Sequence, residues 1–310
     1  MAALTAAPAP VPDTSRAAPA GRRRQRPRLW RGLVGLLAGV YFLGPMFFSV
    51  LFTVDVPGRG FTFASYSGIL GTAGFWPGVR LTMEMAAATI AGVLLLLVPA
   101  LLAVRLTAPK LRVVVEIVCS LPLVVPAVAL TAGISQVLSW GPEHFADTPL
   151  FQTFNAIQNP GFPLVLVLAY VLMSMPLAYR TLDAGLRAVD VPTLVEAARN
   201  CGASWPRAVL QVVLPNMRGA LLNTAFLTLA LVLGEYTVSS ILGYTPFAVW
   251  IVSIGDSEAQ TSVAVSVISL VLTWGLLLLL AAVGRGGPSV RTSRTTRRRR
   301  AAVPAAQEIS

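Results

Sequence analysis

The sequence is poor in charged residues, which make up only 12% of the chain, against roughly 25% in a typical soluble domain. Hydrophobic residues reach 55% of the 310 positions, and a water-soluble fold is not expected at this composition. The few charges are one-sided, because 24 Lys and Arg residues stand against 13 Asp and Glu and give a net charge of +11. A nucleic-acid-binding protein would also be basic, but it would be far less apolar. The composition therefore favours a protein that crosses a membrane several times and binds no nucleic acid.

Residue types that carry common chemistry are also scarce. Lys110 is the only lysine, and its surroundings do not match the G-x-x-x-x-G-K-[ST] loop that cradles ATP phosphates. A single histidine, His144, and two cysteines, Cys119 and Cys201, cannot form a standard structural zinc site. The sequence contains no G-x-S-x-G, H-E-x-x-H or G-x-G-x-x-G motif. We therefore expect no catalytic residue, no metal site and no cofactor in this chain, and we do not expect it to be an enzyme.

Long apolar runs dominate the rest of the sequence. A helix needs about 20 apolar residues to cross a hydrocarbon core about 30 Å thick. Six stretches are long enough, so the predicted fold class is an all-α membrane protein with six transmembrane helices. The first run follows a cluster of arginines but is longer than the roughly 7–15 residues of a signal-peptide core, so we expect it to be retained. The six predicted spans are Leu33–Val54, Val79–Val104, Val113–Leu138, Phe162–Leu182, Gly219–Leu242 and Thr261–Val283.

The distribution of Lys and Arg predicts how these helices are oriented. When the N-terminus is placed inside the cell, nearly all basic residues lie in cytoplasmic segments or at the inner ends of spans, and Arg59 and Arg80 are the exceptions. The outer segments then carry acidic residues such as Asp55, Asp147 and Glu258. By the positive-inside rule, we predict a multi-pass protein of the bacterial cytoplasmic (inner) membrane with both termini cytoplasmic. The cytoplasmic segments are 1–32, 105–112, 183–218 and 284–310.

The two ends of the chain are basic and low in complexity. Residues 1–32 are rich in Ala, Pro and Arg, and residues 284–310 contain a run of arginines. Because neither segment can bury an apolar core, we predict two disordered cytoplasmic tails. They would anchor the topology and contact anionic lipid, or bind a specific partner. Between them, 33–54 is the predicted first transmembrane helix, 55–78 an extracytoplasmic loop and 79–283 the main bundle.

The long cytoplasmic loop at 183–218 is amphipathic rather than a featureless tether. Val191 and Pro192 are suited to begin a helix, because proline is tolerated in the first turn. Gly202 is suited to end it, and it permits a sharp reversal that a Cβ atom would hinder. The sequence therefore predicts a short helix followed by a tight turn.

A second short helix is predicted from Trp205 to about Val212, and Leu214-Pro215 should end it before the next span. Two short helices around a glycine turn make a compact knob whose apolar face could enter a groove on another protein. The alternative is a surface hairpin that packs on its own bundle. The predicted apolar face consists of Leu194, Val195, Ala198 and Trp205.

The loop also has a specific spacing of residues. It contains Glu196-Ala197-Ala198, three residues, Gly202, nine residues, and then Val212-x-Leu214-Pro215. This pattern resembles the EAA loop of ABC-importer permeases, which is EAA, three residues, G, nine residues and I-x-LP, and only Val212 departs from it. The resemblance covers about residues 79–283 and implies a type I (MetI-like) ABC-importer transmembrane domain. In that family the loop docks into a cleft of a separate ATPase subunit. The residues that would carry this contact are Glu196, Ala197, Ala198, Gly202, Leu214 and Pro215.

The same resemblance implies partners. They are a dimer of ATP-binding subunits that hydrolyses the ATP, a second permease subunit that is either identical or different, and an extracytoplasmic solute-binding protein. The lipid bilayer surrounds the assembly.

Three carboxylates fall inside predicted spans, where a charge costs at least about 2.5 kcal/mol at the centre. Glu84 and Glu116 lie close to span ends, so we expect them to reach the interface or to form a local pair. Glu235 lies deep in the fifth predicted span with no basic residue near it. We therefore expect its partner to come from another helix, another subunit or the substrate.

Short elements near these residues resemble one group of permeases. Gly234-Glu235-Tyr236 resembles the G-E-aromatic element of the polyamine, ferric-iron, sulfate, molybdate and phosphonate permeases, and Leu121-Pro122 with Pro126 resembles their L-P-x-x-x-P. Pathway or gating roles for Glu235 compete with a structural hydrogen bond between helices. The prolines can bend the third span. The candidate pathway residues are Glu235, Tyr236, Pro122 and Pro126.

The sequence thus predicts the permease subunit of an ATP-driven ABC importer for a small solute. Acidic outer segments and Glu235 favour a cation such as a polyamine or ferric iron, while phosphonate, thiamine and sulfate remain open. The rival interpretations are an ATP-independent secondary transporter or channel, which should lack the EAA spacing, and a membrane-embedded enzyme, which should show paired catalytic groups.

Overall fold

The computed structural model of the chain describes residues 29–56 and 60–284. The predicted tails therefore lie outside the described residues except at their inner edges. The chain divides into two compact units, Met1–Phe48 and Ser49–Ser310. The described part of the first unit belongs to helix α1 (Leu29–Val54), which continues into the second unit. This helix contains the predicted first span, and its described stretch Gly32–Val54 is apolar and long enough to cross a membrane.

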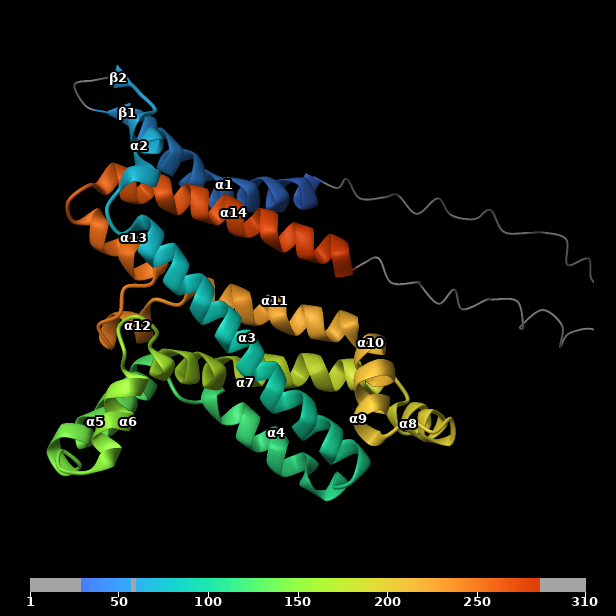
Figure 1. Ribbon diagram of the computed structural model, residues 1–310. Helices are drawn as coiled ribbons and strands as arrows, with labels where there is room; N and C mark the ends of the chain where they lie inside the picture. The colour runs from blue at the N-terminus through green and yellow to red at the C-terminus, as the bar shows by residue number, and fades with distance from the viewer. Residues whose placement is uncertain (1–28, 57–59, 285–310) are drawn as a thin grey trace, which may run out of the picture. The chain divides into compact units, whose positions relative to one another are not determined.

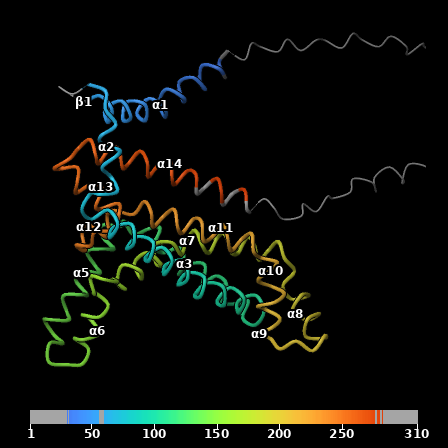
Figure 2. The backbone as a smooth tube through the Cα atoms, turned by 45° about the horizontal axis from the view of Figure 1, so that its top comes forward, coloured from blue at the N-terminus to red at the C-terminus, as the bar shows by residue number. Residues whose placement is uncertain are grey.

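Three long helices form the centre of the second unit. They are α3 (Phe75–Leu106), α7 (Leu164–Ala188) and α11 (Arg218–Gly234), which pack against one another over most of their length (Figures 1 and 2). On α3 the buried positions recur at helical spacing, as in Met85, Thr89 and Val93, so one stripe of the helix faces the core.

Shorter elements surround this centre. Helix α14 (Ala259–Gly284) packs against α11 and α13, and α5 and α6 form a hairpin that extends beyond the end of α7 (Figure 1). The other elements are β1 (Asp55–Val56), β2 (Gly60–Phe61), α2 (Ala64–Ser67), η1 (Ile69–Gly71), η2 (Pro109–Leu111), α4 (Arg112–Ser120), η3 (Leu121–Leu123), α5 (Ala127–His144), α6 (Pro149–Ile157), α8 (Val191–Asn200), α9 (Trp205–Ala208), η4 (Val209–Val213), α10 (Leu214–Asn216), α12 (Thr237–Ile241) and α13 (Phe247–Gly255).

The described part of the chain contains three helices that are long and apolar enough to cross a membrane, α1, α3 and α7, or up to five spans if two bent helix pairs each count as one. Helix α14 is continuous from Ala259 to Gly284, and its described stretch Ala259–Gly275 counts as a shorter apolar helix. The protein is thus a mostly helical membrane protein in which two of the predicted spans are interrupted, and the predicted count of six spans stays a prediction.

The third predicted span, Val113–Leu138, is wrong as a single helix. The segments Pro109–Leu123 and Ala127–His144 meet at a bend of 98°. Pro126 has an extended ψ of 142° and directly precedes α5, and Pro122 lies in the short helix η3. Proline lacks an N–H donor and disfavours the helical conformation of the residue before it, so this pair ends one helix and begins another.

The fifth predicted span, Gly219–Leu242, is also shorter than expected. Helix α11 ends at Gly234, and Glu235 is extended with ψ at 120° before α12 begins.

The predicted extracytoplasmic loop at 55–78 has structure of its own, including a small antiparallel pairing of β1 with β2. The prediction of an all-α fold therefore holds except for this two-stranded ribbon.

A second, smaller hydrophobic core, formed by Ile69, Trp250, Ala264 and Val265, lies beside the start of α3. The indole nitrogen of Trp250 donates to the carbonyl of Ala73 at 3.0 Å. Gly74 beside it has φ at +85°, and a Cβ atom there would lie 2.6 Å from the same indole nitrogen. Only glycine fits this position, both for its conformation and for the close approach of the tryptophan.

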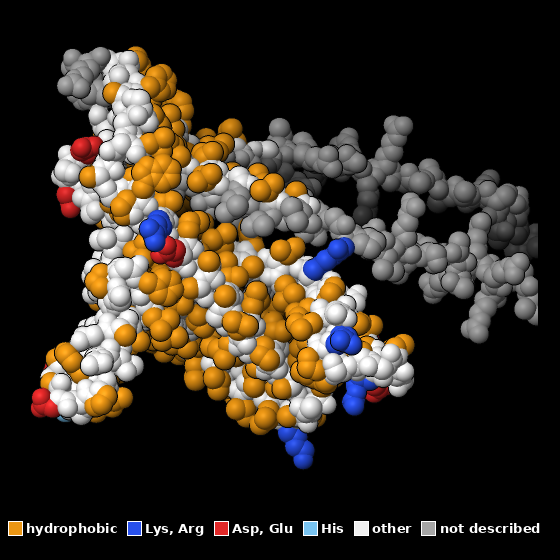
Figure 3. Space-filling view, viewed as in Figure 1, with side chains coloured by type: hydrophobic (Ala, Val, Ile, Leu, Met, Phe, Trp, Pro, Cys, Tyr) orange, Lys and Arg blue, Asp and Glu red, His pale blue; other side chains and the backbone are white. Residues whose placement is uncertain are grey.

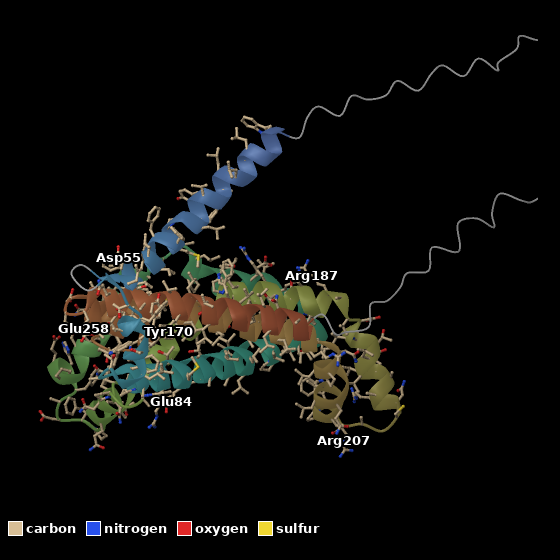
Figure 4. The ribbon with its side chains drawn as sticks, turned by 90° about the horizontal axis from the view of Figure 1, so that it is seen from above. Asp55, Glu84, Tyr170, Arg187, Arg207 and Glu258 are labelled. Atoms are coloured by element: carbon tan, nitrogen blue, oxygen red, sulfur yellow. The ribbon has the colours of Figure 1, made fainter. Side chains whose placement is uncertain are left out.

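Charged side chains gather toward the two ends of the bundle, while apolar side chains cover its length (Figure 3). Arg187 and Arg207 lie toward one end, and Tyr170 and Glu258 toward the other (Figure 4). This separation matches a protein whose middle lies in lipid and whose ends meet water.

Candidate functional site

The 183–218 loop is shorter than predicted, because α7 continues to Ala188 and includes Asp183. Helix α8 then begins at Val191, as predicted. The carboxylate of Asp190 caps it by accepting from the Thr193 hydroxyl at 2.7 Å and from the Thr193 N–H at 3.5 Å. Only Val189 and Asp190 separate the two helices, so α8 is held close to the end of α7.

Gly202 makes the predicted reversal. Its φ is +86°, and its N–H donates to the carbonyl of Arg199 while the N–H of Ala203 donates to the carbonyl of Ala198. These two bonds form a Schellman motif, which satisfies the last carbonyls of α8 and needs a left-handed residue at this position. The turn directs the chain from α8 into α9.

The prediction that Leu214 and Pro215 end the second helix is wrong. Helix α9 passes through a π-helical turn, η4, directly into α10, which contains both residues. Pro215 lies inside this continuous run, where it cannot donate an N–H to the π-helical turn before it. The chain turns instead at Met217, and the segments on either side meet at 75°.

The loop divides its residues between its own bundle and its surface. Val191 and Val195 are buried in the main core, with 0% and 6% exposure, and Ala198 and Leu214 pack against that core. The predicted apolar face therefore partly covers the chain's own helices. The coupling candidates that remain exposed are Glu196, Ala197, Gly202 and Pro215.

Two large apolar side chains add to this exposed surface. Trp205 is 43% exposed and Leu210 is 63% exposed, although Ala208 and Val209 between them are buried. Helices α8 and α9 stand at the end of the bundle, beyond α7 and α11 (Figure 1). Tryptophan is among the residues enriched at the centre of protein contact surfaces, so Trp205 is the stronger candidate of the two. Leu210 was not expected from the sequence, where it reads as an ordinary apolar position.

Glu235 differs from its prediction in both place and partner. It lies in the break between α11 and α12, at the end of α11 opposite to α10 (Figure 1), and not in the middle of a span. Its carboxylate accepts from the N–H of Val238 at 2.9 Å and of Ser239 at 3.4 Å, and from the Ser239 hydroxyl at 3.3 Å. Its donors thus come from its own segment, where a carboxylate caps the start of a helix.

Hydrogen bonding extends from this cap to α7. The Tyr170 hydroxyl donates to the Ser239 hydroxyl at 3.2 Å, and Tyr170 is buried. Helix α12 also packs against α5, the helix that follows Pro126. Tyr236 next to the cap is 40% exposed. The structure therefore places the two interrupted helices beside α7 near the same end of the bundle.

The pathway candidates and the coupling candidates form two separate groups. Helix α11 has 17 residues and is about 25 Å long at 1.5 Å per residue. The 183–218 loop precedes it, and the Glu235 break follows it. Any influence of one group on the other must pass along the bundle.

The sequence reasoning missed a cluster around Asp183. This buried carboxylate forms ion pairs with Arg105 at 2.8 Å, with Arg187, and with Arg112 at 3.7 Å. An aspartate four residues before an arginine near a span end is a local signal for part of this cluster. The other two arginines are remote in sequence.

The remaining polar residues behave more simply. Glu84 forms the expected local pair with Arg80 at 2.7 Å. Cys119 is buried and Cys201 is exposed, and both thiols are free. Among residues 29–56 and 60–284, no group of three or more His, Cys, Asp or Glu side chains could hold a metal ion.

Comparisons with known proteins agree with this architecture. Residues 96–286 match the family described as "binding-protein-dependent transport system inner membrane component". A probable ABC transporter permease protein, y4fN of Sinorhizobium fredii (strain NBRC 101917 / NGR234), is 27% identical over 264 residues, which is 81% of this chain. The chain spans 44% of the length of that relative.

A solved structure shares the fold. It is a crystal structure of a bacterial alginate ABC transporter in complex with an alginate pentasaccharide-bound periplasmic protein. The match has a TM-score of 0.56 at 14% identity and covers 83% of this chain and 92% of that one.

Proposed function

Because the chain belongs to the family of binding-protein-dependent transport system inner membrane components, we propose that it is the membrane-spanning permease subunit of an ATP-driven importer of a small solute. It forms part of the translocation pathway and contains no catalytic site of its own. A separate pair of ATPase subunits supplies the energy, and a solute-binding protein delivers the solute.

The observation that carries the coupling part of this proposal is the geometry of the 183–218 loop. Buried Val191 and Val195 fix α8 to the bundle, while Glu196, Ala197 and Gly202 stay exposed. A partner that presses on this exposed face moves α8, and α8 cannot move without the core residues beneath it. Small Ala197 and the Gly202 turn let a partner approach the backbone closely, and Trp205 offers an apolar anchor.

The orientation follows from charge. The end that carries this loop is the basic end of the described chain, and the positive-inside rule supports the proposal that this end and both termini face the cytoplasm, where the proposed ATPase acts. A second permease subunit, identical or different, completes the pathway.

The solute is proposed only as a small molecule delivered by the binding protein. A cation such as a polyamine or ferric iron was favoured partly by Glu235, whose carboxylate has donors of its own. Glu235 therefore no longer favours a cation over phosphonate as the solute. The periplasmic protein of the structural relative binds alginate, which adds a saccharide to the candidate solutes. Measuring which of these solutes binds to the purified binding protein decides among them.

The two native cysteines allow a direct test of ATPase docking. In the assembled complex, maleimide labelling of Cys201 should slow by about tenfold or more when the ATPase is bound, because the exposed thiol lies beside Gly202 on the docking surface. Cys119 is buried and should remain unlabelled with or without the ATPase.

A matched control places the only reactive thiol elsewhere. The variant Cys201→Ser with Ser257→Cys carries an exposed thiol just before α14, at the other end of the bundle. Its labelling should not change on ATPase binding. Equal labelling of Cys201 with and without a bound ATPase would place the ATPase on another surface and overturn the coupling role.

A further inference from the structure

One buried carboxylate is shared by arginines from three helices. Asp183 lies in the last two turns of α7 and is 7% exposed. Arg105, in the last turn of α3, donates to one carboxylate oxygen at 2.8 Å and to the backbone carbonyl of Asp183 at 3.1 Å. Arg187, one turn later on α7, donates through Nε to the other oxygen at 2.8 Å. Arg112, the first residue of α4, has a terminal nitrogen 3.7 Å from that same oxygen.

A carboxylate in this position needs its partners, because burial removes the water that would otherwise stabilise the charge. The guanidinium of Arg105 is also held in one orientation, since it contacts both the side chain and the backbone of α7. Arg187 pairs with Asp183 inside α7, whereas Arg105 and Arg112 reach Asp183 from other helices and so depend on the present arrangement of the ends of α3, α4 and α7. The cluster therefore fixes the relative positions of three helix ends.

The same helix ends carry the 183–218 loop. Val191 and Val195 of α8 belong to one core cluster with Leu102 of α3 and Leu186 of α7. A displacement of α8 is thus delivered to α3 and α7 at the level of Asp183. Helix α4 packs directly against α7 and follows α3 through η2, and the ion cluster adds a charged link between the ends of all three helices.

Helix α11 is held to the same group by close packing. A Cβ atom at Gly185 of α7 would collide with the side chain of Ala220 of α11. The two helices therefore approach too closely here for either to move alone.

We propose that Asp183 is a positioning residue that makes the ends of α3, α4 and α7 move as one body when the ATPase displaces the loop. This proposal rests on the proposed function above. In this role Asp183 acts through the arginines that it pairs with, so that a displacement of the loop reaches all three helix ends together.

The test compares Asp183→Asn with a matched ion-pair variant. Glu84→Gln removes a pair of similar length on α3, Arg80–Glu84 at 2.7 Å, but that pair joins residues of one helix only. Each complete complex, with its ATPase and second permease subunit, is reconstituted in liposomes. ATP hydrolysis is measured with and without the solute-binding protein, purified with the solute that it carries. Stimulation by this protein reports the signal that crosses the membrane through the permease.

Asp183→Asn should assemble with the ATPase and keep its unstimulated hydrolysis within about twofold, while stimulation falls on the order of tenfold, a typical coupling between distant sites. Glu84→Gln should behave as wild type. Asp183→Glu should recover most of the stimulation, because it restores a charged acceptor. Arg105→Gln should be more damaging than Arg112→Gln, whose arginine is farther from Asp183 and half exposed.

Full stimulation in assembled Asp183→Asn would overturn the proposal. If Asp183→Asn reduces the yield of complex, Arg105→Lys decides, because it keeps every charge but removes the terminal guanidinium nitrogen that donates to both the carboxylate and the backbone carbonyl of Asp183. Reduced stimulation supports the proposal, and unchanged stimulation overturns it. Failure of the proposed function looks different, since the wild-type chain would then bind no ATPase and Cys201 would never be protected.

Discussion

A buried carboxylate lies near each end of α7: Asp183 belongs to its last two turns, and Glu235 lies near its start, where Tyr170 contacts Ser239. The two carboxylates are stabilised in different ways. Asp183 is 7% exposed and Glu235 is 8% exposed. Asp183 is neutralised by guanidinium groups from α3, α4 and α7. Glu235 accepts from two amides and a hydroxyl within four residues of itself, and only Tyr170 connects that group to another helix.

This difference separates a joint between helices from a local cap. Removing the acceptor at Asp183 leaves several charges of one sign close together, and it frees three helix ends. Removing the charge at Glu235 leaves neutral donors, and it affects the start of one five-residue helix. We therefore expect the loop end to be the mechanically rigid end and the opposite end, with its two interrupted helices, to be the one that rearranges.

The largest effect is expected for Asp183→Ala. Breaking a buried ion pair by removing one partner costs about 3–5 kcal/mol, since the arginines lose their common acceptor. Thermal unfolding in detergent or nanodiscs measures this loss against wild type. A cost similar to that of Glu84→Ala, whose exposed pair should contribute less than about 1 kcal/mol, would contradict the distinction.

Gly185→Ala should be the next most damaging. The added methyl group meets the side chain of Ala220, and overpacking of this kind costs about 1–3 kcal/mol. Gly219→Ala is the control, because no atom lies within 4 Å of its would-be Cβ atom. In the same unfolding assay Gly219→Ala should be neutral or stabilising, and equal losses in both variants would argue against close packing of α7 on α11.

Two substitutions of Glu235 distinguish the contribution of its charge from that of its hydrogen bonds. Glu235→Gln keeps a side-chain oxygen that can accept from Val238, so its stability loss should stay below about 1 kcal/mol, whereas Glu235→Ala loses the cap and about 1–2 kcal/mol. Solute uptake should be near normal in Glu235→Gln if the carboxylate serves only as a cap. Loss of uptake with unchanged stability would instead assign the charge a role in the pathway.

An effect about as small as that of Glu235→Gln is expected for Tyr170→Phe. The variant removes one hydrogen bond, worth about 0.5–1.5 kcal/mol, while the Ser239 hydroxyl keeps Glu235 as a neighbour. A double-mutant cycle with Ser239→Ala measures the coupling between the two hydroxyls. A coupling as large as that between Asp183 and Arg105 would mean that this end is tied as firmly as the other.

Long, uninterrupted elements were predictable from the sequence because their signal is local. Helices α3 and α7 follow from apolar runs, and the start of α8 and the Gly202 turn follow from Val191, Pro192 and the glycine itself. The break after Glu235 also had a local signal, since its acceptor serves residues three and four positions later. The apolar residues on both sides of Glu235 instead predicted one continuous helix over 219–242.

Other features depend on packing that no local pattern encodes. Pro122 and Pro126 indicate a bend, but the 98° angle depends on what surrounds α5. Arg105 and Asp183 are 78 positions apart, so only the folded bundle brings them together. The division of the loop between buried Val195 and exposed Glu196 likewise depends on where the core of α3 and α7 ends.

The most direct test of the central claim compares two glycines. Gly202 and Gly243 both have positive φ, +86° and +78°, and neither would place a Cβ atom within 4 Å of another group, but Gly202 lies in the 183–218 loop and Gly243 follows α12. Valine at either position should strain the backbone by a similar amount, about 1–2 kcal/mol. The measurement is how much ATPase co-purifies with each tagged variant. We predict that Gly202→Val loses most of the bound ATPase and Gly243→Val retains it; equal retention in both variants would contradict docking at this loop.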